Sequence, residues 1–132
     1  MPKTQAQGTA AETQFEARID GVRTRFASKL ADKIQQTTAA LPRMTENGSG
    51  AAAVVENAYR WFHDISGIAS TIGFEATGQS ARSCDAILAG PYRSQRGLSA
   101  VELVQLTESL EALRVTAQAE IHAMDLNRGL IS

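Results

Sequence analysis

The fold is decided by residues 61–74, which read WFHDISGIASTIGF. On a helix, the apolar side chains of this stretch recur every three or four residues, which predicts one buried face. The residues on that face are Phe62, Ile65, Ala69 and Ile72. His63, one of two histidines in the chain, falls outside it. The stretch therefore predicts a helix that is buried on one side and presents an imidazole on another.

A second group of residues shares the predicted surface with His63. Its members are Tyr59, Arg60, Ser66, Gly67 and Ser70. Gly67 is informative because a glycine inside a helix costs about 1 kcal/mol relative to alanine. A backbone without a side chain at this position would let another molecule come close to the imidazole.

Helical patterns cover most of the remaining chain. They predict helices at about residues 11–40, 51–71, 75–89 and from Ser99 to shortly before Asn127. Pro42 ends the first because proline cannot continue a helix, and Gly73 is a typical C-terminal stop for the second. Residues 1–10 are polar and are predicted to be disordered, whereas residues 43–50 and 90–97 are expected to be loops.

This pattern predicts an all-α fold, an antiparallel up-down-up-down four-helix bundle over residues 11–127. We find no strand-like alternation and no internal repeat in the sequence. The length of 132 residues suits one domain. A hydrophobic content of 43%, few aromatic residues and only three prolines favour aliphatic helix packing over a sheet.

Composition argues against several classes of function. The net charge of −1 predicts no bulk attraction to nucleic acid or to an anionic membrane. No run approaches the roughly 20 apolar residues of a membrane span, and the N-terminus has no apolar signal-peptide core. The single cysteine, Cys84, excludes an internal disulfide and favours a cytoplasmic location. Neither a metal-site spacing nor a glycine-rich phosphate loop is present, so we expect no bound metal, no cofactor and no self-phosphorylation.

The stretch resembles the signature of histidine-containing phosphotransfer (HPt) domains of bacterial phosphorelays. That signature has the form His-x-Leu-Lys-Gly-(Ser/Ala)-(Ser/Ala)-x-x-x-Gly and lies on the second helix of a four-helix bundle. Its matching positions here are His63, Ile65, Gly67, Ala69 and Gly73. Two positions depart from it, since Ser66 replaces the usual lysine and Ile68 replaces a small residue.

The resemblance implies that His63 is a phosphoacceptor. A neutral imidazole is a good nucleophile near pH 7. The chain would accept a phosphoryl group from a response-regulator receiver domain or a hybrid histidine kinase and pass it to an aspartate on a second receiver. By the same resemblance, the receiver brings Mg²⁺ and most of the catalytic machinery. We expect a monomer whose docking residues are Tyr59, Arg60, Ser66, Gly67, Ile68, Ser70 and Arg82.

Asp85 is the candidate that would orient the imidazole. It lies about twelve residues beyond the turn at Gly73, so an antiparallel return would bring it level with His63. HPt domains often carry a Glu or Gln at the matching position. A carboxylate that accepts a hydrogen bond from Nδ1–H would fix the tautomer and leave Nε2 free to attack. The alternative is a surface aspartate paired with Arg82, three residues earlier on the same helix.

Two departures keep other functions open. Without the family lysine, Ser66 supplies only a hydroxyl, and Arg60 or Arg82 would have to provide positive charge. Each of these arginines could equally be solvated. The rival functions are a helical adaptor or sensor bundle that is silent in phosphotransfer, and a phosphoacceptor domain of a larger histidine kinase.

Overall fold

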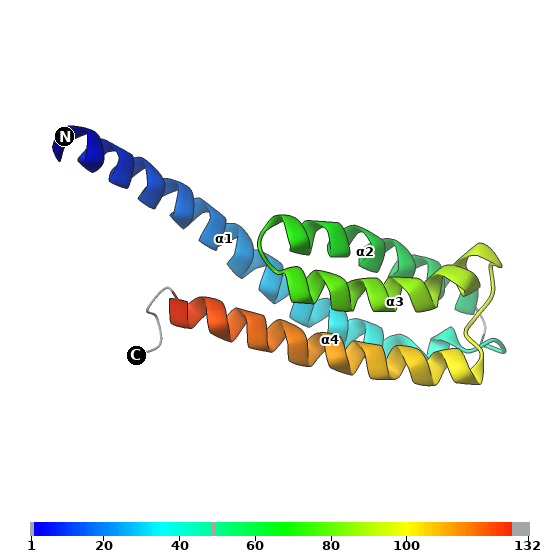
Figure 1. The fold of residues 1–132 in the computed structure, drawn as a ribbon. Coiled ribbons are helices and arrows are strands. Elements are labelled where there is room, and N and C mark those ends of the chain that lie inside the picture. Colours follow the sequence, from blue (N-terminus) through cyan, green and yellow to red (C-terminus); the bar gives the residue numbers. More distant parts are fainter. Residues whose placement is uncertain (1, 49, 128–132) are drawn as a thin grey trace.

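The computed structural model describes residues 2–48 and 50–127. Its elements are α1 Pro2–Ala40, the short 3-10 helix η1 Leu41–Met44, α2 Ala51–Thr71, α3 Glu75–Arg93 and α4 Ala100–Asn127 (Figure 1). The described part of the chain contains no strand, and an isolated bridge joins Thr45 to Leu98. The predicted all-α class with four main helices is therefore confirmed.

Most helix ends fall close to their predicted places. The helix that carries His63 spans the predicted range, and Gly73 follows it at φ +96°, a conformation that glycine adopts without strain. α1, however, begins at Pro2 and continues through residues 2–10, which were expected to be disordered. Proline is favourable at the first position of a helix because its missing N–H would have no partner there.

α3 is longer than predicted. Its expected end at residue 89 is wrong, because the helix continues to Arg93 with Pro91 buried inside it. A proline in the last turn removes only one backbone hydrogen bond from the helix. The chain beyond it is also held, since Ser94 N donates to Gly90 O at 3.0 Å. The extension brings Tyr92 onto α3.

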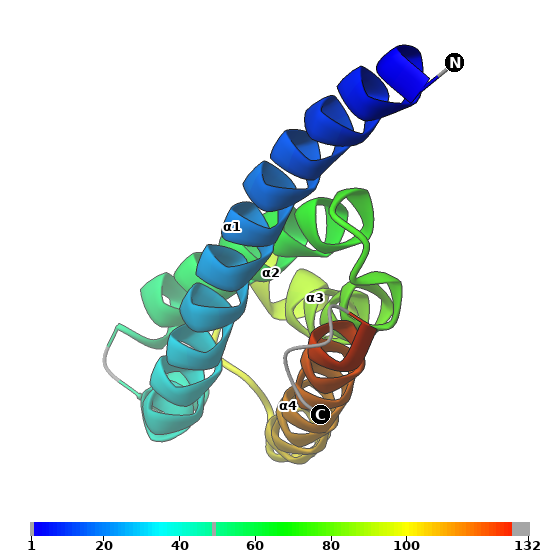
Figure 2. The same ribbon diagram turned by 90° about the vertical axis from the view of Figure 1, so that its left-hand side faces the viewer.

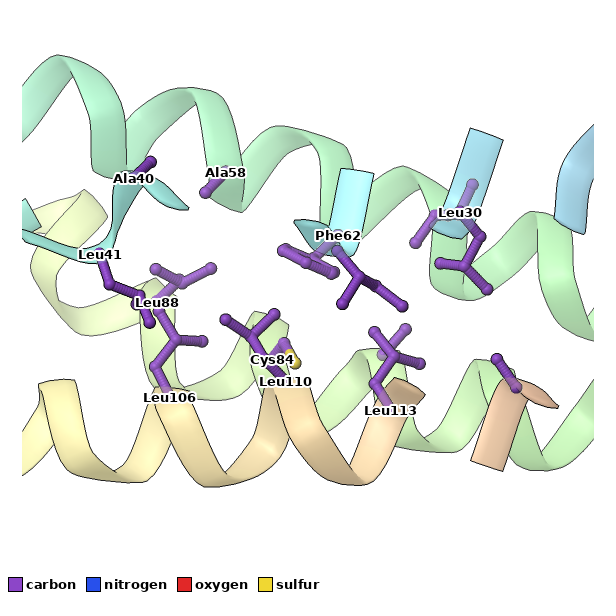
Figure 3. Close-up of a cluster of buried hydrophobic side chains, with 14 of the residues drawn as sticks. Leu30, Ala40, Leu41, Ala58, Phe62, Cys84, Leu88, Leu106, Leu110 and Leu113 are labelled. Atoms are coloured by element: carbon purple, nitrogen blue, oxygen red, sulfur yellow. The ribbon is translucent and has the colours of Figure 1, made fainter. Parts of the chain in front are cut away.

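The core forms where the apolar stripes of the four helices meet (Figure 3). Side chains that are at most 2% exposed include Leu30 of α1, Phe62 of α2, Leu88 of α3, and Leu110 and Leu113 of α4. Fully burying an aliphatic or aromatic side chain of this size contributes about 1.5–3 kcal/mol to stability. Cys84 belongs to the same cluster.

The N-terminal half of α1 projects beyond the other helices (Figures 1 and 2). Phe15 and Val22, which lie on α1 before it packs against the bundle, are exposed. Packing resumes at Phe26, whose ring stacks on that of Phe74 with the centroids 5.5 Å apart. Arg23 also links α1 to the bundle, because its Nε donates to Ile72 O at 2.8 Å, next to the turn between α2 and α3.

Two connections meet at the other end of the molecule. The loop after η1 and the loop after α3 are joined by backbone hydrogen bonds, from Leu98 N to Met44 O (2.6 Å) and from Glu46 N to Leu98 O (3.0 Å). Gly97 permits this approach, because a Cβ at that position would lie 2.6 Å from Thr45 O. The ends of α2 and α3 far from the Gly73 turn are thereby tied to the start of α4.

Side chains cap the N-termini of α3 and α4. Ser99 and Glu102 form a capping box, since Ser99 N donates to Glu102 Oε1 and Glu102 N donates to Ser99 Oγ. The Arg96 guanidinium donates to both oxygens of Glu102 and, together with Ser99, lowers the pKa of this carboxyl to about 2. Glu120 of α4 accepts hydrogen bonds from the first-turn amides of Ala76 and Thr77 on α3. A carboxylate at a helix N-terminus is stabilising.

Of all the helix pairs, α2 and α3 pack together most extensively. Gly78 of α3 is buried, and a Cβ there would lie 2.6 Å from Ser70 Oγ and 3.0 Å from Ser66 O. Only a residue without a side chain fits this contact. Gly78 therefore sets how closely the helix that carries Asp85 approaches the helix that carries His63.

We predict that Gly78→Ala lowers the free energy of unfolding by about 1–3 kcal/mol, because the added methyl group must push α3 away from α2. Gly67→Ala on α2 is the matched control. A Cβ at Gly67 meets no atom within 4 Å, so helix propensity should raise stability by up to about 1 kcal/mol. Urea denaturation of both variants measures the difference. Equal stabilities would mean that the α2–α3 contact tolerates a side chain.

Candidate functional site

His63 lies on the outward side of α2, as its place outside the apolar stripe predicted. Its neighbours on the stripe, Phe62 and Ile65, are buried, whereas the His63 side chain is 62% exposed. One helix position corresponds to a rotation of about 100°, which separates His63 from the core. The imidazole is accessible from solvent while its backbone is held by a packed helix.

Asp85 of α3 lies beside this imidazole. His63 Nδ1 and Asp85 Oδ2 are 3.2 Å apart, which is hydrogen-bonding distance. The expected juxtaposition of the two side chains is therefore present. An ionised carboxylate can only accept a hydrogen bond, so an ionised Asp85 requires Nδ1 to be the donor, and a neutral imidazole with its proton on Nδ1 carries its lone pair on Nε2. The alternative pairing with Arg82 is not the contact that forms, since Arg82 Nη2 lies 3.4 Å from Ser70 Oγ.

The second oxygen of Asp85 is unusual. Oδ1 is buried and has no hydrogen-bond partner among the described residues, although the side chain as a whole is 21% exposed. A buried acceptor without a donor lowers stability by roughly 1–3 kcal/mol. A buried polar group without a partner calls for an explanation in a folded protein, and a functional role is one such explanation. Asp85 is thus held partly inside the bundle with only Oδ2 directed at the imidazole.

Cys84 lies next to Asp85 but takes no part in the site. Its side chain is buried in the core, and burial, with a smaller contribution from the Asp85 carboxylate, raises the pKa of the thiol to about 12. The thiolate is the reactive form of cysteine. Cys84 is therefore a core residue rather than a nucleophile.

The surface beyond His63 on α2 is open. Gly67 is exposed with no atom near the position of a Cβ, and Ile68 is 48% exposed. Both residues lie on the outside of the helix, where they were expected. A surface that combines an exposed aliphatic side chain, bare backbone and an imidazole suits contact with another protein.

Ser66 is a correction to the predicted docking surface. It is 6% exposed, and its hydroxyl donates to His63 O on the same helix at 2.9 Å. The cause is Gly78, which lets α3 come so close that position 66 is covered. Ser70, predicted to be on the same surface, is half-buried in this contact. Ser66 therefore cannot offer its hydroxyl to a group bound at the imidazole.

The positive charges near His63 are both engaged. Arg60 is exposed, and its Nη2 donates to Glu56 Oε1 at 2.8 Å. This hydrogen bond and the charge of Glu56 raise the pKa of Arg60. Arg82 is exposed and reaches Ser70 from the opposite helix. Neither guanidinium contacts the imidazole, so each would have to turn to meet an anion bound there.

Tyr59 is half-buried, and its ring lies against the imidazole of His63. Tyr59 also stacks on Tyr92, a residue that the sequence did not suggest because the helix was expected to end at residue 89. Gly78 was also missed. A glycine within a predicted helix was the one signal that could have indicated a close helix contact there.

One hollow near the site, of about 560 Å³, is lined by Arg60 and Tyr92 among other residues. A groove of about 770 Å³ lies between α1 and α4, and its lining includes neither His63 nor Asp85. Within residues 2–48 and 50–127, no group of three or more His, Cys, Asp or Glu side chains could hold a metal ion. In that same part of the chain, no helix combines the length and the apolar character needed to cross a membrane.

Comparison with known proteins does not assign a function to the chain. The chain matches no protein-family model, no curated protein and no solved structure. What the protein does is therefore inferred from the side chains around His63 and from the resemblance carried by residues 63–73.

Proposed function

We propose that the chain is a cytoplasmic phosphorelay intermediate, an antiparallel up-down-up-down bundle in which His63 carries the phosphoryl group. One observation carries this proposal. An exposed imidazole has its Nδ1 3.2 Å from a half-buried carboxylate, on a helix surface that is open at Gly67. A solvated histidine without function requires no such partner.

The chemistry follows from the tautomer. With its Nδ1–H donated to Asp85, the imidazole attacks phosphorus through the Nε2 lone pair. The N–P bond forms as the P–O bond of a receiver's aspartyl phosphate breaks, and the aspartate leaves as a carboxylate. The product is a phosphorylated imidazole that keeps its Nδ1 proton. Asp85 stabilises the positive charge that develops on the ring. Transfer to a second receiver is the same step in reverse.

The proposed partner is a receiver domain, which would bring Mg²⁺ and the acceptor aspartate. The docking surface on this chain consists of Tyr59, Arg60, His63, Gly67, Ile68 and Arg82. Gly67 lets the partner approach the imidazole, and Ile68 adds apolar contact area. Arg60 and Arg82 reach the phosphoryl group only by leaving their present hydrogen bonds.

A second candidate function is a helical adaptor that binds a partner without phosphotransfer. The observation in its favour is the scarcity of free positive charge around His63. Ser66 is buried where the family has lysine, and both nearby arginines are engaged. The experiments below separate the two functions, because an adaptor would bind receivers but take no label.

Replacing His63 with Gln should abolish labelling by a panel of receivers phosphorylated with labelled phosphate, because the nucleophile is lost. Stability should change by no more than about 0.5 kcal/mol, since the side chain is exposed. The wild-type label should be labile to acid and stable to alkali, as a phosphoramidate is. His122→Gln on α4 is the control and should label normally. An acid-stable label, or labelling that survives in the His63 variant, would contradict the proposal.

Asp85→Ala should slow transfer about 5- to 30-fold, which corresponds to the roughly 1–2 kcal/mol of an orienting hydrogen bond. Asp85→Asn should keep part of the rate, because its amide oxygen can still accept from Nδ1–H. Asp64→Ala is the control, since it removes an exposed negative charge next to His63 and leaves the hydrogen bond intact. Equal rates for the Asp85→Ala and Asp64→Ala variants would mean that Asp85 acts only as a charge.

Gly67→Leu should fold well but transfer poorly, because the new side chain fills the open space beside the imidazole where a receiver would approach. Gly67→Ala, with a single methyl group, should be affected much less. Receiver binding by calorimetry and transfer by label measure the two effects, and circular dichroism checks the fold. If the Leu variant binds and transfers as the wild type does, the partner does not touch this surface.

A further inference from the structure

The imidazole of His63 belongs to a cluster of three rings that are linked by two stacked contacts. Tyr59 lies one turn earlier on α2, and its ring stacks on His63 with the centroids 5.6 Å apart and the planes 23° apart. Tyr59 also stacks on Tyr92 of α3, at 4.3 Å and 14°. These three residues, the aromatic column, link the two helices along the surface.

The column is anchored at its inner end. Tyr59 and Tyr92 are half-buried and pack against the hydrophobic core, whereas the His63 side chain is 62% exposed. An exposed side chain normally samples several rotamers, and fixing it lowers its conformational entropy. The contact with Tyr59 offsets part of that cost, because a stacked pair contributes to stability beyond the burial of its area.

The two contacts of His63 restrict different motions. The hydrogen bond to Asp85 holds one edge of the ring, but it leaves the ring free to swing about the line from Nδ1 to Oδ2. The ring of Tyr59 lies against one face of the imidazole and opposes that swing. Together they restrict the orientation of the imidazole ring.

We propose that Tyr59 is a positioning residue for His63 and that Tyr92 braces it, a role that rests on the proposed function of His63 as phosphoacceptor. The ring of Tyr59, rather than its hydroxyl, does the positioning. Tyr59 also belongs to the proposed docking surface, and its positioning effect is the part that it exerts through the imidazole on which it stacks.

Two substitutions distinguish an effect of the aromatic ring of Tyr59 from an effect of its volume. Tyr59→Phe keeps the ring and should retain most of the wild-type transfer rate. Tyr59→Leu keeps an apolar side chain but has no ring face, and should slow transfer by about 2- to 10-fold. Tyr92→Leu removes the brace and should give a smaller loss in the same direction. Circular dichroism and urea denaturation check that each variant is folded.

An NMR readout tests positioning without any phosphotransfer. The ring protons of His63 should be shifted upfield by Tyr59 in the wild type and in Tyr59→Phe, and the ¹⁵N shifts should indicate the Nδ1–H tautomer. Both signatures should weaken in Tyr59→Leu. His122, the second histidine, lies on α4 and serves as an internal reference whose signals should not move. If Tyr59→Leu does not fold, Tyr59→Met, which also lacks a ring, is compared in the same way.

Each result of these experiments bears on either the positioning role of Tyr59 or the proposed function of His63. Unchanged His63 signals and an unchanged rate in Tyr59→Leu would overturn the positioning role. A rate in Tyr59→Phe as low as in Tyr59→Leu would assign the effect to the hydroxyl and overturn it as well. If the wild type takes no label from any receiver, the proposed function fails, and the His63 signals still determine whether Tyr59 positions the ring.

Discussion

The close contact of α2 and α3 at Gly78 is the constraint on which the site depends. Since this glycine has no Cβ, the backbone of Ser66 and the hydroxyl of Ser70 fill the space that a side chain would need. With the turn at Gly73 and this contact both fixed, the register of α3 along α2 is set. Pairs of residues then face one another at increasing distance from the turn: Ser70 with Gly78, His63 with Asp85, and Tyr59 with Tyr92.

The same contact distributes polar groups between the inside and the outside of the hairpin. It covers Ser66 and half-buries Asp85, so that one carboxylate oxygen lies inside without a described partner and the other faces the imidazole. A carboxylate held in this way has little freedom to follow a moving histidine. It therefore suits a fixed acceptor for Nδ1–H better than a flexible surface charge would.

Gly67 and Gly78 illustrate how one residue type serves two purposes. Both lie inside helices, where glycine is unfavourable, and both are near His63 in the hairpin. Gly78 is buried against the neighbouring helix, whereas Gly67 faces open space. Gly78 lets α3 pack closely against α2. Gly67 leaves open space on the outside of α2, where a receiver would approach on the proposed function.

The sequence by itself determined the helical class, the ends of α2, the exposure of His63 and its approach to Asp85. These follow from local rules: the spacing of apolar residues, the glycine stop at position 73 and the rise of a helix per residue. Only the tertiary structure decided the burial of Ser66, the stacking of Tyr92 on Tyr59 and the engagement of the two arginines. Each depends on how far apart two helices lie and on which side chain fills the space between them. Periodicity along one helix carries no information about that distance, which here is set by the missing side chain of Gly78.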